Sequence, residues 1–127
     1  MPIKLGVVGI ATRDMAASLA FYRLLGLPLP EGQPLEPHVE LDLGGVRLCW
    51  DSVELLREVY QGWEEPRGHR IELAFECSSP DEVDQLYERV VAGGYEGHRE
   101  PWDAFWGQRY AVLRDPDGNL ISLYAAL

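Results

Sequence analysis

The chain has 127 residues, of which 46% are hydrophobic and 25% charged, proportions typical of a globular domain. Its 21 acidic and 11 basic residues give a net charge of -10, which disfavours binding to the phosphate backbone of nucleic acids. Because the sequence has neither a membrane-length apolar run nor a secretory signal pattern, we expect a cytoplasmic protein without membrane partners. Cys49 and Cys77 match no zinc motif or disulfide framework. The acidic surface either attracts cationic ligands or simply keeps the protein soluble.

The first half of the chain is predicted to contain strands around one long helix. Asp14 is a suitable N-cap for that helix, and Gly26 is a suitable residue to end it. In chain order we expect a strand over residues 3–12, a helix over 15–25, a short edge strand and loop near the prolines at 28, 30 and 34, strands over 38–43 and 46–51, a helix over 52–60 and a polar connector up to 68.

The second half is predicted to repeat this order. Ser79-Pro80-Asp81-Glu82 reads as a capping box that begins a helix, which ends near Gly93. Strands are expected over residues 69–77, 96–100, 108–114 and 120–125. Moving the first half forward by 65 positions places Asp14 on Ser79, and moving it by 73 places the turn at 42–45 on the turn at 115–118. We interpret the two halves as a duplication in which each half needs the other to bury its sheet.

These residues resemble the vicinal oxygen chelate superfamily, which includes glyoxalase I, bleomycin-resistance proteins and extradiol dioxygenases. The resemblance rests on the run from Gly9 through Asp14 to Phe21-Tyr22-Arg23-Leu24-Leu25-Gly26, and on Trp106-Gly107-Gln108-Arg109 ahead of Asp115-Pro116-Asp117-Gly118-Asn119. It implies an α+β fold of two tandem βαβββ modules whose curved mixed sheets enclose a cavity, with the helices outside. We expect a single domain over residues 1–127, with modules at 1–51 and 69–127 and a connector at 52–68. Relatives of this length pair, so a homodimer is also implied.

The resemblance also implies where a metal would bind, at one position on the first and one on the last strand of each module. In this chain those positions hold Val7, Cys49, Glu72 and Ser122. Glu72 alone is a strong ligand, and the histidines at 38, 69 and 98 are expected near the surface, away from ligand positions. We therefore predict neither a metal nor another cofactor.

A hollow lined by small and aromatic residues is predicted in place of the metal. Glu72 either forms a salt bridge with Arg47 or Arg70 or contacts a ligand, and Cys49 is treated as a packing residue rather than a nucleophile. The aromatic residues at 102–106 are predicted to lie in a loop, where they form a lid over the pocket, plug the end of the barrel or line a dimer interface. The predicted ligand-binding residues are Glu72, Arg47, Cys49, Ser122, Tyr124, Trp102, Phe105, Trp106 and Arg109.

Three functions are compatible with this pattern. The first is a metal-independent protein that sequesters an aromatic or cationic, antibiotic-like small molecule and has no catalytic residues. The second is a metal-dependent lyase or dioxygenase of the same superfamily with a rearranged site. The third is a protein whose hollow is filled by its own side chains and whose function lies in dimerisation.

Overall fold

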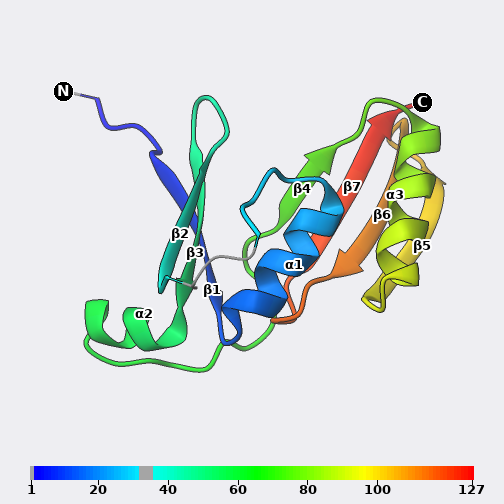
Figure 1. The fold of residues 1–127 in the computed structure, drawn as a ribbon. Helices are drawn as coiled ribbons and strands as arrows, with labels where there is room; N and C mark the ends of the chain where they lie inside the picture. The colour runs from blue at the N-terminus through cyan, green and yellow to red at the C-terminus, as the bar shows by residue number, and fades with distance from the viewer. Residues whose placement is uncertain (1, 32–35) are drawn as a thin grey trace.

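Two β-sheets and three helices make up the computed structural model, which describes residues 2–31 and 36–127 (Figure 1). The first sheet has the order β1-β3-β2 and the second the order β4-β7-β6-β5. The strands are β1 (Val7–Thr12), β2 (His38–Asp42), β3 (Arg47–Ser52), β4 (Leu73–Glu76), β5 (Glu96–Ala104), β6 (Gln108–Arg114) and β7 (Leu120–Ala126), and the helices are α1 (Met15–Leu25), α2 (Val53–Val59) and α3 (Pro80–Ala92). The predicted α+β class is confirmed, with one mixed sheet of three strands and one of four. Within residues 2–31 and 36–127, no helix is long and apolar enough to cross a membrane.

The strand register confirms the internal repeat. In the first sheet, β1 runs parallel to β3 with Gly9 opposite Cys49. In the second sheet, β4 runs parallel to β7 with Ala74 opposite Ser122. Because Gly9 and Ala74 are 65 residues apart and Cys49 and Ser122 are 73 apart, the two pairs are equivalent under the shifts read from the sequence.

The helix ends follow the predicted capping residues. The Asp14 carboxylate accepts a hydrogen bond from the amide of Ala17 at 3.0 Å, and the Ser79 hydroxyl accepts one from the amide of Glu82 at 3.1 Å. The Glu82 carboxylate in turn accepts from the amide of Ser78, at 2.8 Å, one residue before the partner that an ideal capping box would use.

The strands differ from the predictions at the module edges. Residues 28–31 and 36–37 form no strand, and the rest of the predicted edge strand lies outside the described residues. Strand β5 continues to Ala104, so Trp102 lies in a strand and not in the predicted loop. Irregular pairing with β6 on either side of Arg99 lets β5 continue past the predicted end at residue 100.

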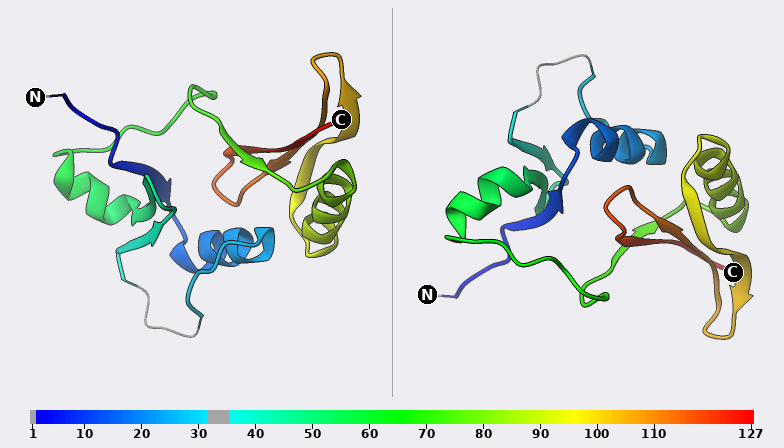
Figure 2. Two further views of the ribbon diagram at one scale, coloured as in Figure 1. Left: turned by 90° about the horizontal axis from the view of Figure 1, so that it is seen from above. Right: turned by 90° about the horizontal axis from the view of Figure 1, so that it is seen from below.

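Helix α1 lies between the two sheets in Figure 1 and contacts α3. Its Phe21 and Tyr22 are fully buried in one continuous core that draws residues from both sheets. The two sheets stay separate and do not close into one barrel. The views in Figure 2 show the connector after α2 as the segment that runs from one module to the other.

The hydroxyl of Tyr22 joins the first module to the second. It donates a 2.7 Å hydrogen bond to the carboxylate of Asp115, in the turn between β6 and β7. The same carboxylate accepts from the backbone amides of Asp117 and Asn119 and from the Asn119 side chain. Burial of Tyr22 and the negative charge of Asp115 raise the pKa of the tyrosine hydroxyl far above its ordinary value, so it remains a donor.

Replacing Tyr22 with Phe is expected to lower the free energy of unfolding by about 2 kcal/mol, because the buried Asp115 carboxylate loses a hydrogen bond. Urea denaturation followed by Trp fluorescence measures this loss. Tyr87→Phe is the matched control, since Tyr87 is only partly buried and makes no such bond to Asp115. Equal stability losses in the two variants would contradict the role given to the Tyr22–Asp115 bond.

Candidate functional site

A cavity of about 350 Å³ opens on the face of the second sheet that lies away from α3. The lining residues come from β5, β6 and β7 and from the segment that leads into β4. They are Glu72, His98, Arg99, Trp102, Tyr110, Val112, Leu120 and Ser122. The structure thus brings together three of the predicted site residues, Glu72, Trp102 and Ser122. The volume of the cavity falls within the range of small-molecule pockets, roughly 300–1,000 Å³.

Aromatic rings form a row across this face. Trp102, Tyr110 and Tyr124 occupy opposite positions on β5, β6 and β7. The ring centroids of Trp102 and Tyr110 are 5.4 Å apart, and the rings of Tyr110 and Tyr124 stack at 6.4 Å. Trp106 meets the Tyr110 ring edge-on at 5.4 Å. The row offers ring faces and edges of the kind that hold flat ligands.

Phe105 and Trp106, in the turn after β5, extend this aromatic group. Phe105 is 96% exposed, and its ring lies 5.0 Å from that of Trp106. Arg99 lies over one ring of the row, with its guanidinium carbon 3.5 Å from the centroid of the Trp102 ring. This cation–π contact fixes the position of Trp102, a role that the sequence analysis did not identify.

Glu72 is exposed and lies at the entrance to β4. Its predicted salt bridge with Arg47 is wrong, because Arg47 lies on the first sheet and pairs with Glu40 at 3.0 Å. Within residues 2–31 and 36–127, Arg70 does not pair with Glu72 either. The carboxylate is therefore available to a ligand in the cavity.

Arg109 does not face the cavity. Its guanidinium donates to both carboxylate oxygens of Asp84 on α3, at 2.9 and 3.1 Å, and to Asp103 at 3.1 Å. These hydrogen bonds raise the pKa of Arg109. Because neighbouring strand residues face opposite sides, the next residue, Tyr110, points into the cavity instead.

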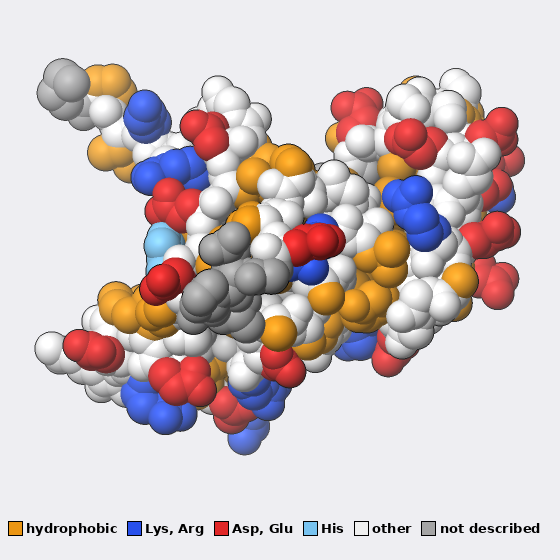
Figure 3. All heavy atoms as spheres, viewed as in Figure 1, with side chains coloured by type: hydrophobic (Ala, Val, Ile, Leu, Met, Phe, Trp, Pro, Cys, Tyr) orange, Lys and Arg blue, Asp and Glu red, His pale blue; other side chains and the backbone are white. Residues whose placement is uncertain are grey.

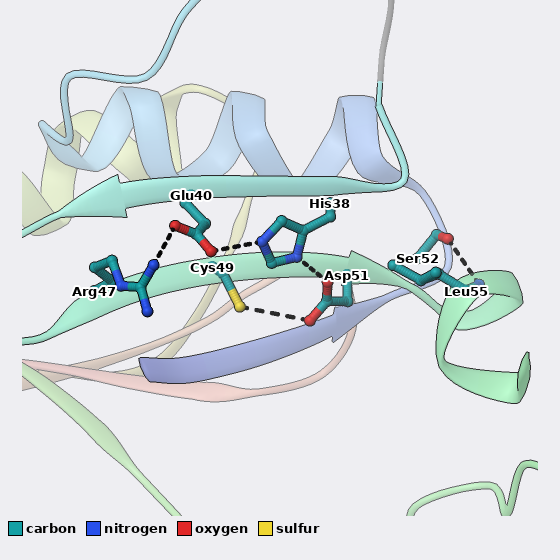
Figure 4. Close-up of polar contacts among 7 residues, drawn as sticks. All are labelled: His38, Glu40, Arg47, Cys49, Asp51, Ser52 and Leu55. Carbon is teal, nitrogen blue, oxygen red and sulfur yellow. Dashed lines mark hydrogen bonds and ion pairs between the residues drawn. The ribbon is translucent and has the colours of Figure 1, made fainter. Parts of the chain in front are cut away.

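A separate group of polar side chains lies on the first sheet (Figure 4). It contains the predicted site residues Arg47 and Cys49, together with His38, Glu40 and Asp51. The His38 ring contacts the Asp51 carboxylate through Nδ1 and the Glu40 carboxylate through Nε2, the latter at 2.8 Å. The Cys49 thiol lies 3.5 Å from Asp51 Oδ2. Figure 4 shows the group on the face of the sheet opposite α1.

Titration of two residues in this group is shifted by their neighbours. Hydrogen bonds to Asp51 and then Glu40 raise the pKa of His38. Burial, with a further contribution from the Asp51 charge, raises the pKa of Cys49 to about 11. The thiol is only 1% exposed and stays protonated at neutral pH, which agrees with its interpretation as a packing residue and not a free nucleophile.

Sequence spacing alone does not connect His38 with Cys49, although the two lie close together. His38 is exposed, as predicted, but β2 pairs with β3 so that His38 is opposite Asp51 and Glu40 is opposite Cys49. The alternation of polar residues along both strands of this hairpin was the signal that could have revealed the group.

A second, larger cavity of about 750 Å³ lies between β1, the connector and β4. Val7 and Gly9 from β1, Trp63 and His69 from the connector, and Leu73 from β4 are among its lining residues. The indole of Trp63 donates to Glu65 at 2.7 Å. Its walls combine aliphatic residues with polar and charged side chains, namely Arg13, Glu65, His69, Arg114, Asp117 and Asn119, but they lack the row of stacked aromatic rings found beside the first cavity.

The four positions that the resemblance assigns to a metal do not form a suitable donor set. Val7 offers hydrocarbon alone, and Cys49 lies on the first sheet, whereas Ser122 lies on the second and Glu72 leads into it. A carboxylate and a neutral hydroxyl make a weak site for a divalent ion. We therefore derive no chemistry through a metal held at these four positions.

Acidic side chains are spread over both ends of the face seen in Figure 3, with Lys and Arg side chains among them. On this face the acidic side chains do not gather into one patch. The acidic balance there serves solubility more than recognition of one cationic partner.

Comparison with known proteins places the chain in a family. The model of the glyoxalase/bleomycin resistance protein/dioxygenase superfamily matches residues 4–123. A crystal structure of such a protein from Nocardioides is 30% identical, with a TM-score of 0.77 over 100% of this chain and 85% of the other. A family enzyme from Burkholderia phytofirmans PsJN is 26% identical, with a TM-score of 0.84 over 98% and 100%. The uncharacterized protein YraH of Bacillus subtilis is 28% identical over 98% of this chain and 100% of its own length. The chain belongs to the glyoxalase/bleomycin resistance protein/dioxygenase superfamily.

Proposed function

We propose that the chain binds a small, flat aromatic or cationic molecule in the 350 Å³ cavity of the second sheet and sequesters it unchanged. The observation that carries this proposal is the row of Trp102, Tyr110 and Tyr124 beside the carboxylate of Glu72. The rings provide stacking surfaces, and the carboxylate can accept a hydrogen bond or pair with a positive charge. An antibiotic-like compound with fused rings and an amine has both features.

The residues around this cavity favour binding over catalysis. A nucleophile needs an adjacent base, and a general base needs a second group that polarises the substrate. Among the described residues that line the cavity, His98 is the one that carries an imidazole. Its Nδ1 lies 3.3 Å from Arg114 Nη2. The proposed binding is also independent of a metal, because stacking and charge pairing at these side chains need none.

The alternative is a metal-dependent lyase or dioxygenase with a rearranged site. Family membership allows it, because the superfamily includes enzymes as well as resistance proteins. In that case Glu72 would act on a metal-bound substrate, and its removal would abolish turnover rather than weaken equilibrium binding.

We further propose that two copies of the chain pair in the cytoplasm. The turn after β5 exposes Phe105 and Trp106, and the amide of the C-terminal Leu127 donates to the carbonyl of Gly107 in this turn. These apolar side chains are favourable to cover with a second copy. Cys49 and Cys77 are free thiols, which suits a reducing compartment.

The binding proposal is tested with acriflavine, a planar cationic three-ring dye. Wild-type protein in EDTA is expected to quench dye or Trp fluorescence at saturation, and Glu72→Gln and Tyr110→Ala are each expected to weaken the affinity by about 10-fold, or about 1.4 kcal/mol. Glu88→Gln, on the exposed side of α3, is the matched control and should bind like the wild type. Equal affinity for all four proteins would contradict the proposal, and turnover that needs a divalent ion and Glu72 would favour the alternative.

The pairing proposal is tested by light scattering coupled to size exclusion. The wild type is expected at twice the chain mass of 14.3 kDa, and Phe105→Asp is expected to shift the mass towards one chain because it places a charge in the apolar contact. Glu58→Gln, an exposed change on α2, serves as the control. A wild-type mass of one chain at high protein concentration would refute the dimer.

A further inference from the structure

We propose that the open face of the first sheet is a binding site for one zinc ion, or another divalent transition metal of similar ligand preference. The ligands are His38 through Nδ1, Cys49 through Sγ and Asp51 through its carboxylate. Their donor atoms all lie within 4.8 Å of one another. The site is on a different sheet from the Glu72 cavity and does not depend on the function proposed for that cavity.

The three donor types select the metal. Imidazole nitrogen, thiolate sulfur and carboxylate oxygen are the ligands that zinc binds, at about 2.0–2.3 Å. The Cys49 thiol, protonated in the metal-free protein, loses its proton to solvent when zinc binds. Two such ligands on one tetrahedral ion lie roughly 3.5 Å apart. The distance from Cys49 Sγ to Asp51 Oδ2 is 3.5 Å, and the other oxygen of Asp51 already faces His38 Nδ1. Asp51 thus lies between the other two ligands, so a bound ion requires small side-chain shifts.

A second carboxylate orients the imidazole. Glu40 lies 2.8 Å from His38 Nε2, which leaves Nδ1 as the nitrogen that faces Asp51 (Figure 4). Arg47 donates to the other oxygen of Glu40 at 3.0 Å and holds this carboxylate in place. A carboxylate bound to the distant nitrogen of a ligand histidine is the usual outer partner at zinc sites, where it fixes the ring and strengthens the ligand.

The neighbouring strand leaves space above the donor atoms. Gly9 lies opposite Cys49, and a Cβ at Gly9 would lie 3.3 Å from Cys49 Sγ and 3.5 Å from Asp51 Oδ2. The absence of a side chain there keeps the approach to the sulfur and the carboxylate open. Gly9 also lines the 750 Å³ cavity, so a fourth ligand on the metal, a water or a small molecule, could enter from that side.

The proposed site differs from the metal position implied by the family. Cys49 occupies one of the four family positions, but His38 and Asp51 do not, and they come from the β2–β3 hairpin of one sheet. All three ligands are therefore supplied by neighbouring strands of one module. Three protein ligands with one open position are typical of zinc sites that bind or activate a small molecule.

The test titrates metal-free protein with Zn²⁺ in competition with a chromophoric chelator. The wild type is expected to bind one ion per chain, and Cys49→Ser and His38→Ala are each expected to lose affinity by about 100-fold or more. Glu40→Ala, which removes the outer carboxylate, should lose about 10-fold. Cys77→Ser and His69→Ala are the matched controls, because they remove a buried thiol and an exposed imidazole elsewhere, and they should bind like the wild type.

Co²⁺ gives a second readout that does not depend on affinity. The wild-type complex should show a thiolate-to-cobalt charge-transfer band in the near ultraviolet, and Cys49→Ser should lose it while Cys77→Ser keeps it. Circular dichroism and thermal unfolding in EDTA establish that each variant is folded, and Glu40→Ala, on an exposed side chain, provides the comparison if Cys49→Ser fails to fold.

Two results would overturn the metal proposal: no tighter zinc binding by the wild type than by His38→Ala, or retention of the thiolate band in Cys49→Ser. Acriflavine binding in EDTA distinguishes this outcome from failure of the binding proposal. Cys49→Ser should leave dye affinity unchanged, and Glu72→Gln should leave zinc affinity unchanged, because the two sites lie on different sheets.

Discussion

The buried contact of Tyr22 with Asp115 holds the two modules in their observed arrangement. Tyr22 comes from α1, between the sheets, and Asp115 comes from the turn that joins the last two strands. Because Asp115 is buried and also accepts hydrogen bonds from the turn itself, the bond couples the shape of that turn to the position of the helix. Helices α1 and α3, which each follow the first strand of a module, both contribute to one core. One face of each sheet is left free of these helices.

The two free faces differ in chemistry because of strand alternation. On β3, Leu48 and Trp50 point into the core, so Cys49 and Asp51 face the other way and meet the polar residues of β2. On β6, Ala111 and Leu113 are buried, which places Tyr110 in the aromatic row. The duplicated fold thus presents a polar group of potential metal ligands on one module and a stacking surface on the other.

The sequence predicted well what depends on local chemistry. Capping by Asp14 and Ser79, the helix over residues 15–25 and the internal repeat at shifts of 65 and 73 positions all follow from side-chain type and spacing. It predicted poorly what depends on long-range packing. The packing of α1 against α3, the pairing of Arg109 with Asp84 and the strand conformation of Trp102 each depend on contacts between segments far apart in the chain. His38 was assessed alone, and its importance became apparent only when the hairpin register placed it beside Asp51 and Cys49.

In this interpretation each free face carries its own binding site, so that any metal lies away from Glu72. The most direct measurement is an anomalous difference map, recorded at the zinc absorption edge, from crystals grown with one equivalent of zinc. We expect one peak per chain, about 2.3 Å from Cys49 Sγ and within ligand distance of His38 and Asp51. A peak beside Glu72 and Ser122, or no peak near Cys49 in crystals that contain zinc, would contradict the assignment of the metal to the first sheet.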